Sequence, residues 1–170
     1  MYNKYDIFRN LFMYYFLAGL LFFIFIILNI FSENKSIHNF MKYIFIIFRS
    51  SIVLLFIAHT LGLIARWYIS GHAPWGDAYE SMIYVAWATM GIGLLFIKKS
   101  DLTLASTSFV TSMILMIAHW NWMDPSIANL VPVLNSYWLM IHVSVIVGSY
   151  GPFALSMILG FVSLLLIVFI

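Results

Sequence analysis

The sequence contains no cysteine, only four prolines and very few charged side chains. Without cysteine, the chain cannot form a disulfide, a thiolate metal site or an iron–sulfur cluster from its own residues. Charged residues occupy 8% of the 170 positions, whereas a soluble domain carries roughly a quarter because water must cover its surface. The net charge of +2 and the scattered cations give no basic patch for a nucleic acid. The composition therefore excludes a soluble globular enzyme and a nucleic-acid-binding protein.

Apolar residues make up 64% of the chain and fall into runs long enough to cross a bilayer. A membrane-spanning helix needs about 20 mostly apolar residues, and helices satisfy every backbone hydrogen bond within the hydrocarbon. We predict an all-α fold, a polytopic membrane helix bundle with about five transmembrane helices. The predicted spans are residues 11–31, 52–69, 79–97, 102–120 and 137–170. Residues 32–51 are interpreted as a loop.

The cationic residues predict how the helices are oriented. Three cations lie in the predicted loop 32–51, and Lys98 and Lys99 lie in loop 98–101. Short loops rich in Lys and Arg stay in the cytoplasm. The opposite loops, 70–78 and 121–136, contain neither residue type and carry Trp75 and Trp122. We therefore place these two loops and the N-terminus outside the membrane.

The last predicted helix has two unusual features. Residues 137–170 contain no charged side chain, and as a helix they would measure about 50 Å, well beyond a 30 Å hydrocarbon core. Pro152 predicts a kink, because it removes one backbone donor. Ser144, Gly148 and Gly151 form a small-residue face that favours close approach of another helix. Because the apolar run stops without a polar flank, we interpret the chain as the front part of a longer protein or one piece of a split one.

His142 is the first candidate ligand, because imidazole binds haem iron, zinc and copper. On a helix it shares a face with Trp138, Val145 and Ser149. An aromatic ring one turn from an imidazole would suit a flat apolar macrocycle. Alternatively, Trp138 is an interfacial anchor and His142 packs between helices, and the spacing alone leaves both interpretations open.

The segment 71–81 holds the next candidates, His72 and Trp75. Either they contact a ligand at the outer surface or they shape the loop. Asp77 followed by Glu80 fits a capping box at a helix start, which explains Glu80 without a catalytic role. Arg66 either binds an anionic group or extends its charge to the membrane surface.

Two further histidines have two interpretations each. His59 lies near the middle of the second predicted span, where an ionisable group is a functional candidate. The alternative is a neutral imidazole bonded to a hydroxyl of a neighbouring helix, for which Thr103, Thr107 and Thr111 offer a shared face. His119 is either an oriented imidazole beside the second outer loop or an interface residue.

Two segments of the sequence carry a specific pattern. The first reads RWYISGHAPW over residues 66–75 and continues with Tyr79-Glu80-Ser81; the second reads PVLNSYWLMIHVS over residues 132–144. Both segments resemble the CcsA/ResC family of cytochrome c biogenesis proteins, and they occur in the family's order with one helical hairpin between them. The sequence resembles the long fusions in which a ResB-like part precedes the CcsA-like part.

The resemblance implies a system II cytochrome c maturation protein of the bacterial inner membrane, with His72 and His142 outside. Such proteins transport haem (haem b before attachment) to the outer face and present it to apocytochrome c, which receives thioether bonds at a Cys-x-x-Cys-His motif. His142 matches the first of two external haem iron axial ligands, with Trp138 beside it. His72 matches a loop residue without an established ligand role, and His59 matches neither membrane histidine of the family.

The resemblance also implies partners and a division of the chain. The Trp-rich segment and second external histidine of the family do not follow in this sequence, so the expected partners are the remaining CcsA-like segment with that motif, a ResB-like protein and apocytochrome c. Residues 1–49 would be a transmembrane helix and cytoplasmic loop, a topological match for the end of a ResB-like part. Residues 50–170 would be an incomplete CcsA-like domain, at most part of a holocytochrome c synthase. The alternative function is a multi-pass transporter or scaffold subunit without cofactor.

Overall fold

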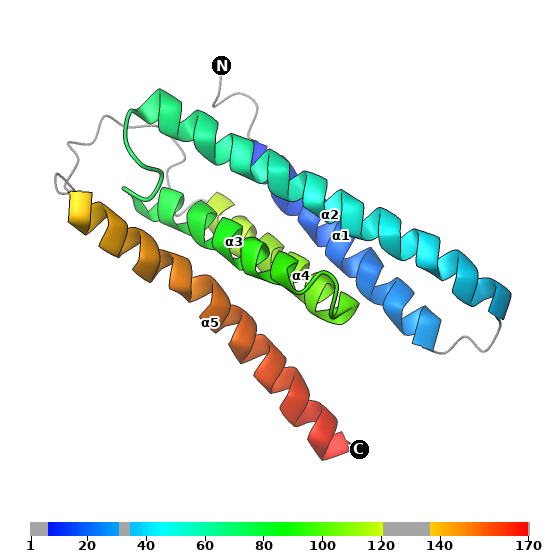
Figure 1. Cartoon of the computed structure of the whole chain (residues 1–170). Helices are drawn as coiled ribbons and strands as arrows, with labels where there is room; N and C mark the ends of the chain where they lie inside the picture. Colours follow the sequence, from blue (N-terminus) through cyan, green and yellow to red (C-terminus); the bar gives the residue numbers. More distant parts are fainter. Residues whose placement is uncertain (1–6, 31–34, 121–136, 170) are drawn as a thin grey trace.

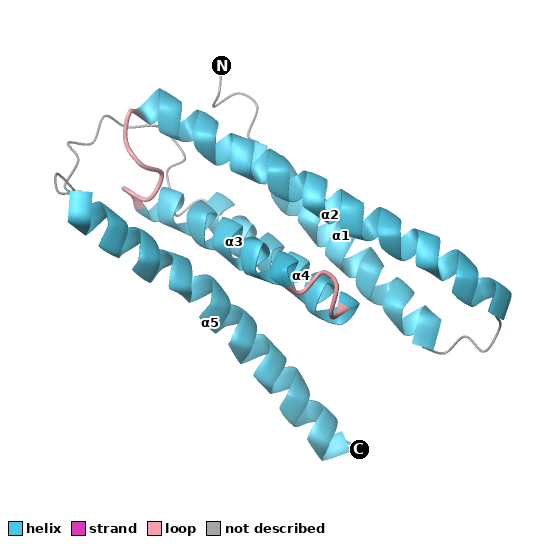
Figure 2. Cartoon of the chain, in the orientation of Figure 1, coloured by secondary structure: helices cyan, strands magenta, loops and turns pink. Residues whose placement is uncertain are grey.

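The computed structural model describes residues 7–30, 35–120 and 137–169 (Figure 1). Within these ranges the chain forms helices joined by short turns, with no strand, as Figure 2 shows. The prediction of an all-α fold is confirmed. The helices are α1 (Ile7–Ile30), α2 (Lys35–Ser70), α3 (Ala78–Leu95), α4 (Asp101–His119) and α5 (Tyr137–Phe169).

Four of these helices are long and apolar enough to cross a membrane. The candidate spans are Ile7–Asn29, Phe40–Ser70, Asp101–His119 and Ile141–Phe161. The 18-residue α3 is not among the four, although it packs along α4 in the bundle. The protein is therefore a multi-pass membrane protein, as predicted.

At two of the helix crossings a glycine lies close to the backbone of another helix. α1 packs on α4, α4 on α3, and α3 on α5, while α2 packs on α1. A Cβ at Gly19 of α1 would lie 3.0 Å from the backbone nitrogen of Phe109, and a Cβ at Gly151 of α5 would lie 2.9 Å from that of Thr89. At both crossings any side chain would collide with backbone. The predicted small-residue face of α5 is confirmed at Gly151, where it contacts α3.

The prediction of a loop at 32–51 is wrong for residues 35–51, which belong to α2. The cations in this stretch suggested a loop, but it contains neither proline nor glycine, so nothing interrupts the helix. The first half of α2 packs on α1, where the Phe22 ring lies 5.5 Å from Phe45 and 5.3 Å from Phe48. Arg49 therefore projects from a helix, and its Nε and Nη2 donate to Asp101 at 2.7 and 2.9 Å.

The fifth helix runs through Pro152 without interruption. Leu155, one turn further on, is buried against the bundle. Most large apolar side chains beyond it are exposed, among them Met157 and Phe161. α5 therefore contacts the described bundle along one narrow face.

Candidate functional site

The candidate residues gather at one end of the bundle. The C-terminal end of α2 and the N-terminal ends of α3 and α5 lie together there (Figure 1). His72 and Trp75 lie in the loop between α2 and α3, and His142 lies in the second turn of α5. The second outer loop, 121–136, lies outside the described residues.

The loop between α2 and α3 is held by its own hydrogen bonds. Gly71 has φ +71°, a left-handed conformation that suits glycine at the end of a helix, and its N–H donates to the Trp67 carbonyl at 3.0 Å. The Ser70 hydroxyl donates to the His72 carbonyl at 2.9 Å. The Trp75 N–H donates to the Ala73 carbonyl at 2.8 Å. These bonds fix the backbone that carries His72 and Trp75.

A buried ion pair between α2 and α3 supports this loop. Arg66 Nε donates to Glu80 Oε1 at 2.9 Å, and each side chain is 1% exposed. The predicted capping box is confirmed in part: Asp77 accepts from the Glu80 N–H at 2.6 Å, but Glu80 Oε2 accepts from the Gly76 N–H at 3.0 Å. Arg66 thus binds a carboxylate of its own chain, so the expectation of a charge reaching the membrane surface is wrong.

His72 lies next to the ion pair of Arg66 and Glu80. Its Nδ1 is 3.1 Å from the Ala73 carbonyl oxygen and 3.7 Å from Glu80 Oε2, and its side chain is 20% exposed. A Cβ at Gly76 would lie 3.4 Å from the His72 ring, so Gly76 leaves space for the imidazole. The interpretation in which His72 shapes the loop is therefore supported, while part of the ring stays accessible.

Five aromatic rings form a continuous series from this loop along α2 and α3, which we call the aromatic ladder. Successive ring centroids are 6.0, 5.0, 5.7 and 5.7 Å apart. The rings are, in order, Trp67, Trp75, Tyr84, Trp87 and Phe56. Of these rings only Trp75 was expected in the outer loop, although the i, i+3 spacing of Tyr84 and Trp87 on one helix was a signal for a shared face.

His142 and Trp138 lie on the opposite side of α5 from the ladder. Trp138 is 77% exposed and His142 is exposed, as is Val145 one turn further along. A Cβ at Gly148 would lie 3.6 Å from the Tyr84 ring, so the glycine face turns toward α3. The structure therefore confirms that Trp138 and His142 share one helix face.

His59 is fully buried. Its Nε2 donates to the Ile83 carbonyl of α3 at 3.2 Å, and the rings of Phe8 and Tyr15 lie 5.5 and 6.1 Å away. The structure favours the neutral, hydrogen-bonded interpretation, but the partner is a backbone carbonyl rather than a threonine of α4. In the part of the chain described, His59 Nδ1 and the Tyr15 hydroxyl have no hydrogen-bond partner.

Two threonine hydroxyls of α4 are bonded within the bundle. Thr107 donates to the Thr103 carbonyl at 2.6 Å, and Thr111 donates to Met90 Sδ at 3.7 Å. Thr107 and Thr111 are fully buried, so these hydroxyls serve packing between α3 and α4 rather than pairing with His59.

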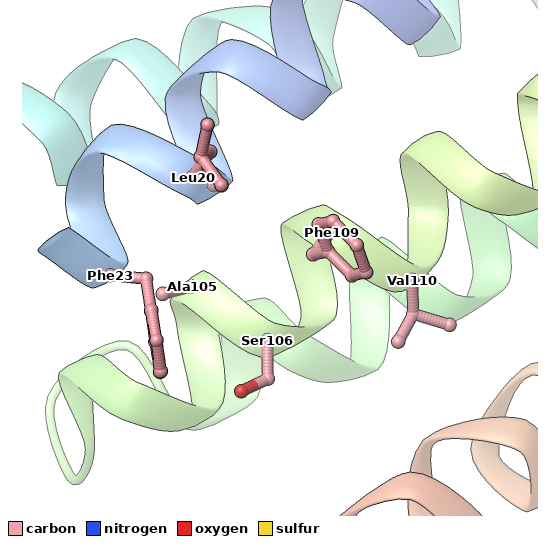
Figure 3. Close-up of a pocket in the computed structure, with 7 residues that line it drawn as sticks. Leu20, Phe23, Ala105, Ser106, Phe109 and Val110 are labelled. Atoms are coloured by element: carbon pink, nitrogen blue, oxygen red, sulfur yellow. The ribbon is translucent and has the colours of Figure 1, made fainter.

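The remaining candidates are peripheral. His119 ends α4 and is exposed, next to the exposed Trp120. A separate cavity of about 280 Å³ lies between α1 and α4 (Figure 3). Its lining contains no His, Asp or Glu; the residues are Gly19, Leu20, Phe23, Ala105, Ser106, Phe109 and Val110.

The side chains available as ligands limit which kind of metal centre the chain could bind. Among the described residues there is no group of three or more His, Asp or Glu side chains that could hold a metal ion. A zinc site needs three or four protein ligands, whereas haem iron takes four from its macrocycle and one or two from the protein. A single exposed imidazole with a tryptophan one turn away fits haem and does not fit a bare ion.

Comparison with known proteins gives one family. Residues 75–169 match the model of the family described as cytochrome C assembly protein. Protein NrfI of Wolinella succinogenes is 48% identical over 115 residues, which is 68% of this chain and 13% of NrfI. The cytochrome c biogenesis protein CcsA of Prochlorococcus marinus (strain MIT 9515) is 31% identical over 156 residues, 84% of this chain and 46% of that protein. CcsA of Lotus japonicus is 31% identical over 71% of this chain and 38% of its own length. The chain thus spans less than half the length of each of these relatives.

Proposed function

The chain belongs to the family of cytochrome c assembly proteins, and from this membership we propose that it handles haem during cytochrome c maturation. In this proposal it presents haem at the outer face of a bacterial inner membrane for attachment to apocytochrome c. Residues 50–170 are the CcsA-like part, and residues 1–49 correspond to the end of a ResB-like part. Further partners are a CcsA-like segment with a Trp-rich motif and a ResB-like protein.

The observation that carries the proposal is the exposed imidazole of His142 on a face of α5 that no described helix covers. His142 is the second residue of the candidate span Ile141–Phe161, which supports a position near the membrane interface. Haem, when bound, supplies the iron and the vinyl groups that accept the thiols of apocytochrome c. His142 would hold it through one ring nitrogen in the neutral state.

In this proposal Trp138 shields the haem. It lies one helical turn outward of His142, and its indole is large and apolar with a polar edge suited to the interface. It would cover part of the macrocycle and limit access of water to the iron. Axial ligation and burial both set the reduction potential of a haem, so the two residues together determine how easily the iron is reduced.

Orientation follows the distribution of charge. Lys98 and Lys99 lie in the turn between α3 and α4, at the opposite end of the bundle from the loop with His72. The N-terminal half of α2, which contains Lys42, extends toward that same end. Because cationic segments stay in the cytoplasm, we place His72 and His142 on the outer side.

The test is the haem spectrum of the purified protein. His142→Gly should remove the spectral contribution of haem ligated by this imidazole, and added imidazole should restore it by occupying the vacated position. His119→Gly, a second exposed histidine at the same end of the bundle, is the matched control and should leave the spectrum unchanged. An unchanged spectrum in His142→Gly without imidazole would contradict the proposal.

A further inference from the structure

The geometry of the loop determines the tautomer of His72. Its Nδ1 faces two oxygen atoms that can only accept, the Ala73 carbonyl at 3.1 Å and Glu80 Oε2 at 3.7 Å. A lone pair at Nδ1 would be repelled by both, so Nδ1 carries the proton in the neutral ring. The lone pair therefore lies on Nε2, for which the described residues provide no hydrogen-bond donor.

The Glu80 carboxyl group is buried, and a donor faces each of its two oxygens. Arg66 donates to Oε1 from a side chain that is equally buried, and its guanidinium is permanently protonated. The Gly76 N–H donates to Oε2, the oxygen nearer His72. A carboxylate beside the N–H of an imidazole fixes the ring orientation and makes the opposite nitrogen a better donor, an arrangement that recurs behind metal-bound histidines.

We propose that His72 is an oriented axial donor, through Nε2, for haem iron at the outer end of the bundle, and that Glu80 is its positioning residue. The inference rests on the proposed function, because that function brings haem to this end of the protein. It adds a haem contact at the α2–α3 loop, separate from the His142 face of α5.

The surroundings of His72 fit a metallated macrocycle better than a bare metal ion. A structural or catalytic ion needs several protein ligands, and no cluster of three donors exists in the described ranges. Trp75 is three residues away and starts the inner part of the aromatic ladder, which offers flat apolar surface.

The experiment compares haem with iron-free protoporphyrin IX, both titrated into the purified membrane protein in detergent. The variants are His72→Gly, Glu80→Gln and His142→Gly, with His119→Gly as the exposed-histidine control. We expect Glu80→Gln to weaken haem binding about 10-fold, as for other residues that orient a ligand, and His72→Gly to weaken it at least as much. Binding of iron-free protoporphyrin should not change, because it forms no bond to Nε2.

Two further readouts separate ligation from a structural role. Imidazole should restore the ligand-dependent haem spectrum of His72→Gly but should not compensate for Glu80→Gln. In Glu80→Gln the haem reduction potential should rise, because the imidazole becomes a weaker donor. If Glu80→Gln does not fold, His72→Gly with imidazole rescue still decides the question.

The possible results are distinguishable. If His72→Gly binds haem like the unmodified protein while His142→Gly loses ligation, the inference about His72 is overturned and the proposed function stands. If His119→Gly weakens binding as much as His72→Gly, the effect is unspecific and the inference is again overturned. If the unmodified protein does not distinguish haem from iron-free protoporphyrin, both proposals fail.

Discussion

Arg66 of α2 and Glu80 of α3 form an ion pair with a 2.9 Å contact, and each side chain is 1% exposed. The pair closes the loop that carries His72 and Trp75. Because both charges are withdrawn from solvent, each depends on the other for compensation. It therefore links the stability of the bundle to the shape of the outer loop.

Breaking this pair should be costly. Arg66→Ala leaves a carboxylate buried without its partner, and removing one member of a buried pair costs about 3–5 kcal/mol. The measurement is unfolding of the purified protein in mixed detergent micelles. Arg49→Ala is the control, because Arg49 and Asp101 are 36% and 21% exposed and such pairs contribute only about 0–1 kcal/mol. Equal losses in the two variants would contradict the assigned role.

The contact between α5 and α3 should depend on Gly151. Gly151→Val places a side chain against the Thr89 backbone, so α5 must separate from α3 and the thermal stability should fall. Gly160 lies on the same helix, and a Cβ added there would have nothing within 4 Å. Gly160→Val should therefore be tolerated, and a similar loss at both positions would argue against this packing.

Removing the Tyr15 hydroxyl should not destabilise the protein. The hydroxyl is buried without a partner in the described part of the chain, and an unsatisfied buried polar group costs about 1–3 kcal/mol. Tyr15→Phe should leave the melting temperature unchanged or raise it. Ser108→Ala provides the contrast, because the Ser108 hydroxyl donates to the Tyr15 carbonyl at 3.0 Å and its loss should cost about 0.5–1.5 kcal/mol. A clear drop in the melting temperature of Tyr15→Phe would reveal a bond at this hydroxyl.

Orientation is directly testable because the sequence contains no cysteine. Ala78 and Lys99 are exposed at opposite ends of the α3–α4 hairpin. A membrane-impermeant maleimide should label Ala78→Cys in intact cells and Lys99→Cys only after permeabilisation. The reverse pattern would place the loop with His72 in the cytoplasm and remove the basis for haem presentation outside.

Helix positions followed from the sequence more readily than the contacts between helices. The apolar runs predicted α3 and α4 to within two residues at each end, because long apolar stretches of a membrane protein form helices that satisfy their own backbone hydrogen bonds. The Asp77 cap was equally readable, since capping is a local interaction. The helix through residues 35–51 was missed because lysine and arginine are as common in cytoplasmic loops as on exposed helix faces, although no helix breaker accompanies them here.

Long-range partners could not be read from the sequence. The pairing of Arg66 with Glu80 and the bond from His59 to the Ile83 carbonyl depend on how α2 docks on α3. A carbonyl leaves no signature in the side-chain pattern. The same holds for Tyr84, whose place between Trp75 and α5 arises from three segments meeting.

The third helix, α3, positions both candidate donors, His72 and His142. The first turn of α3 contains Glu80, which pairs with Arg66 next to His72. The middle of α3 packs on the glycine face of α5, the helix that bears His142. α5 has few contacts with any other described helix. A tilt of α3 would therefore move both imidazoles at once. The distance between the His72 and His142 rings thus depends on how rigid this one short helix is.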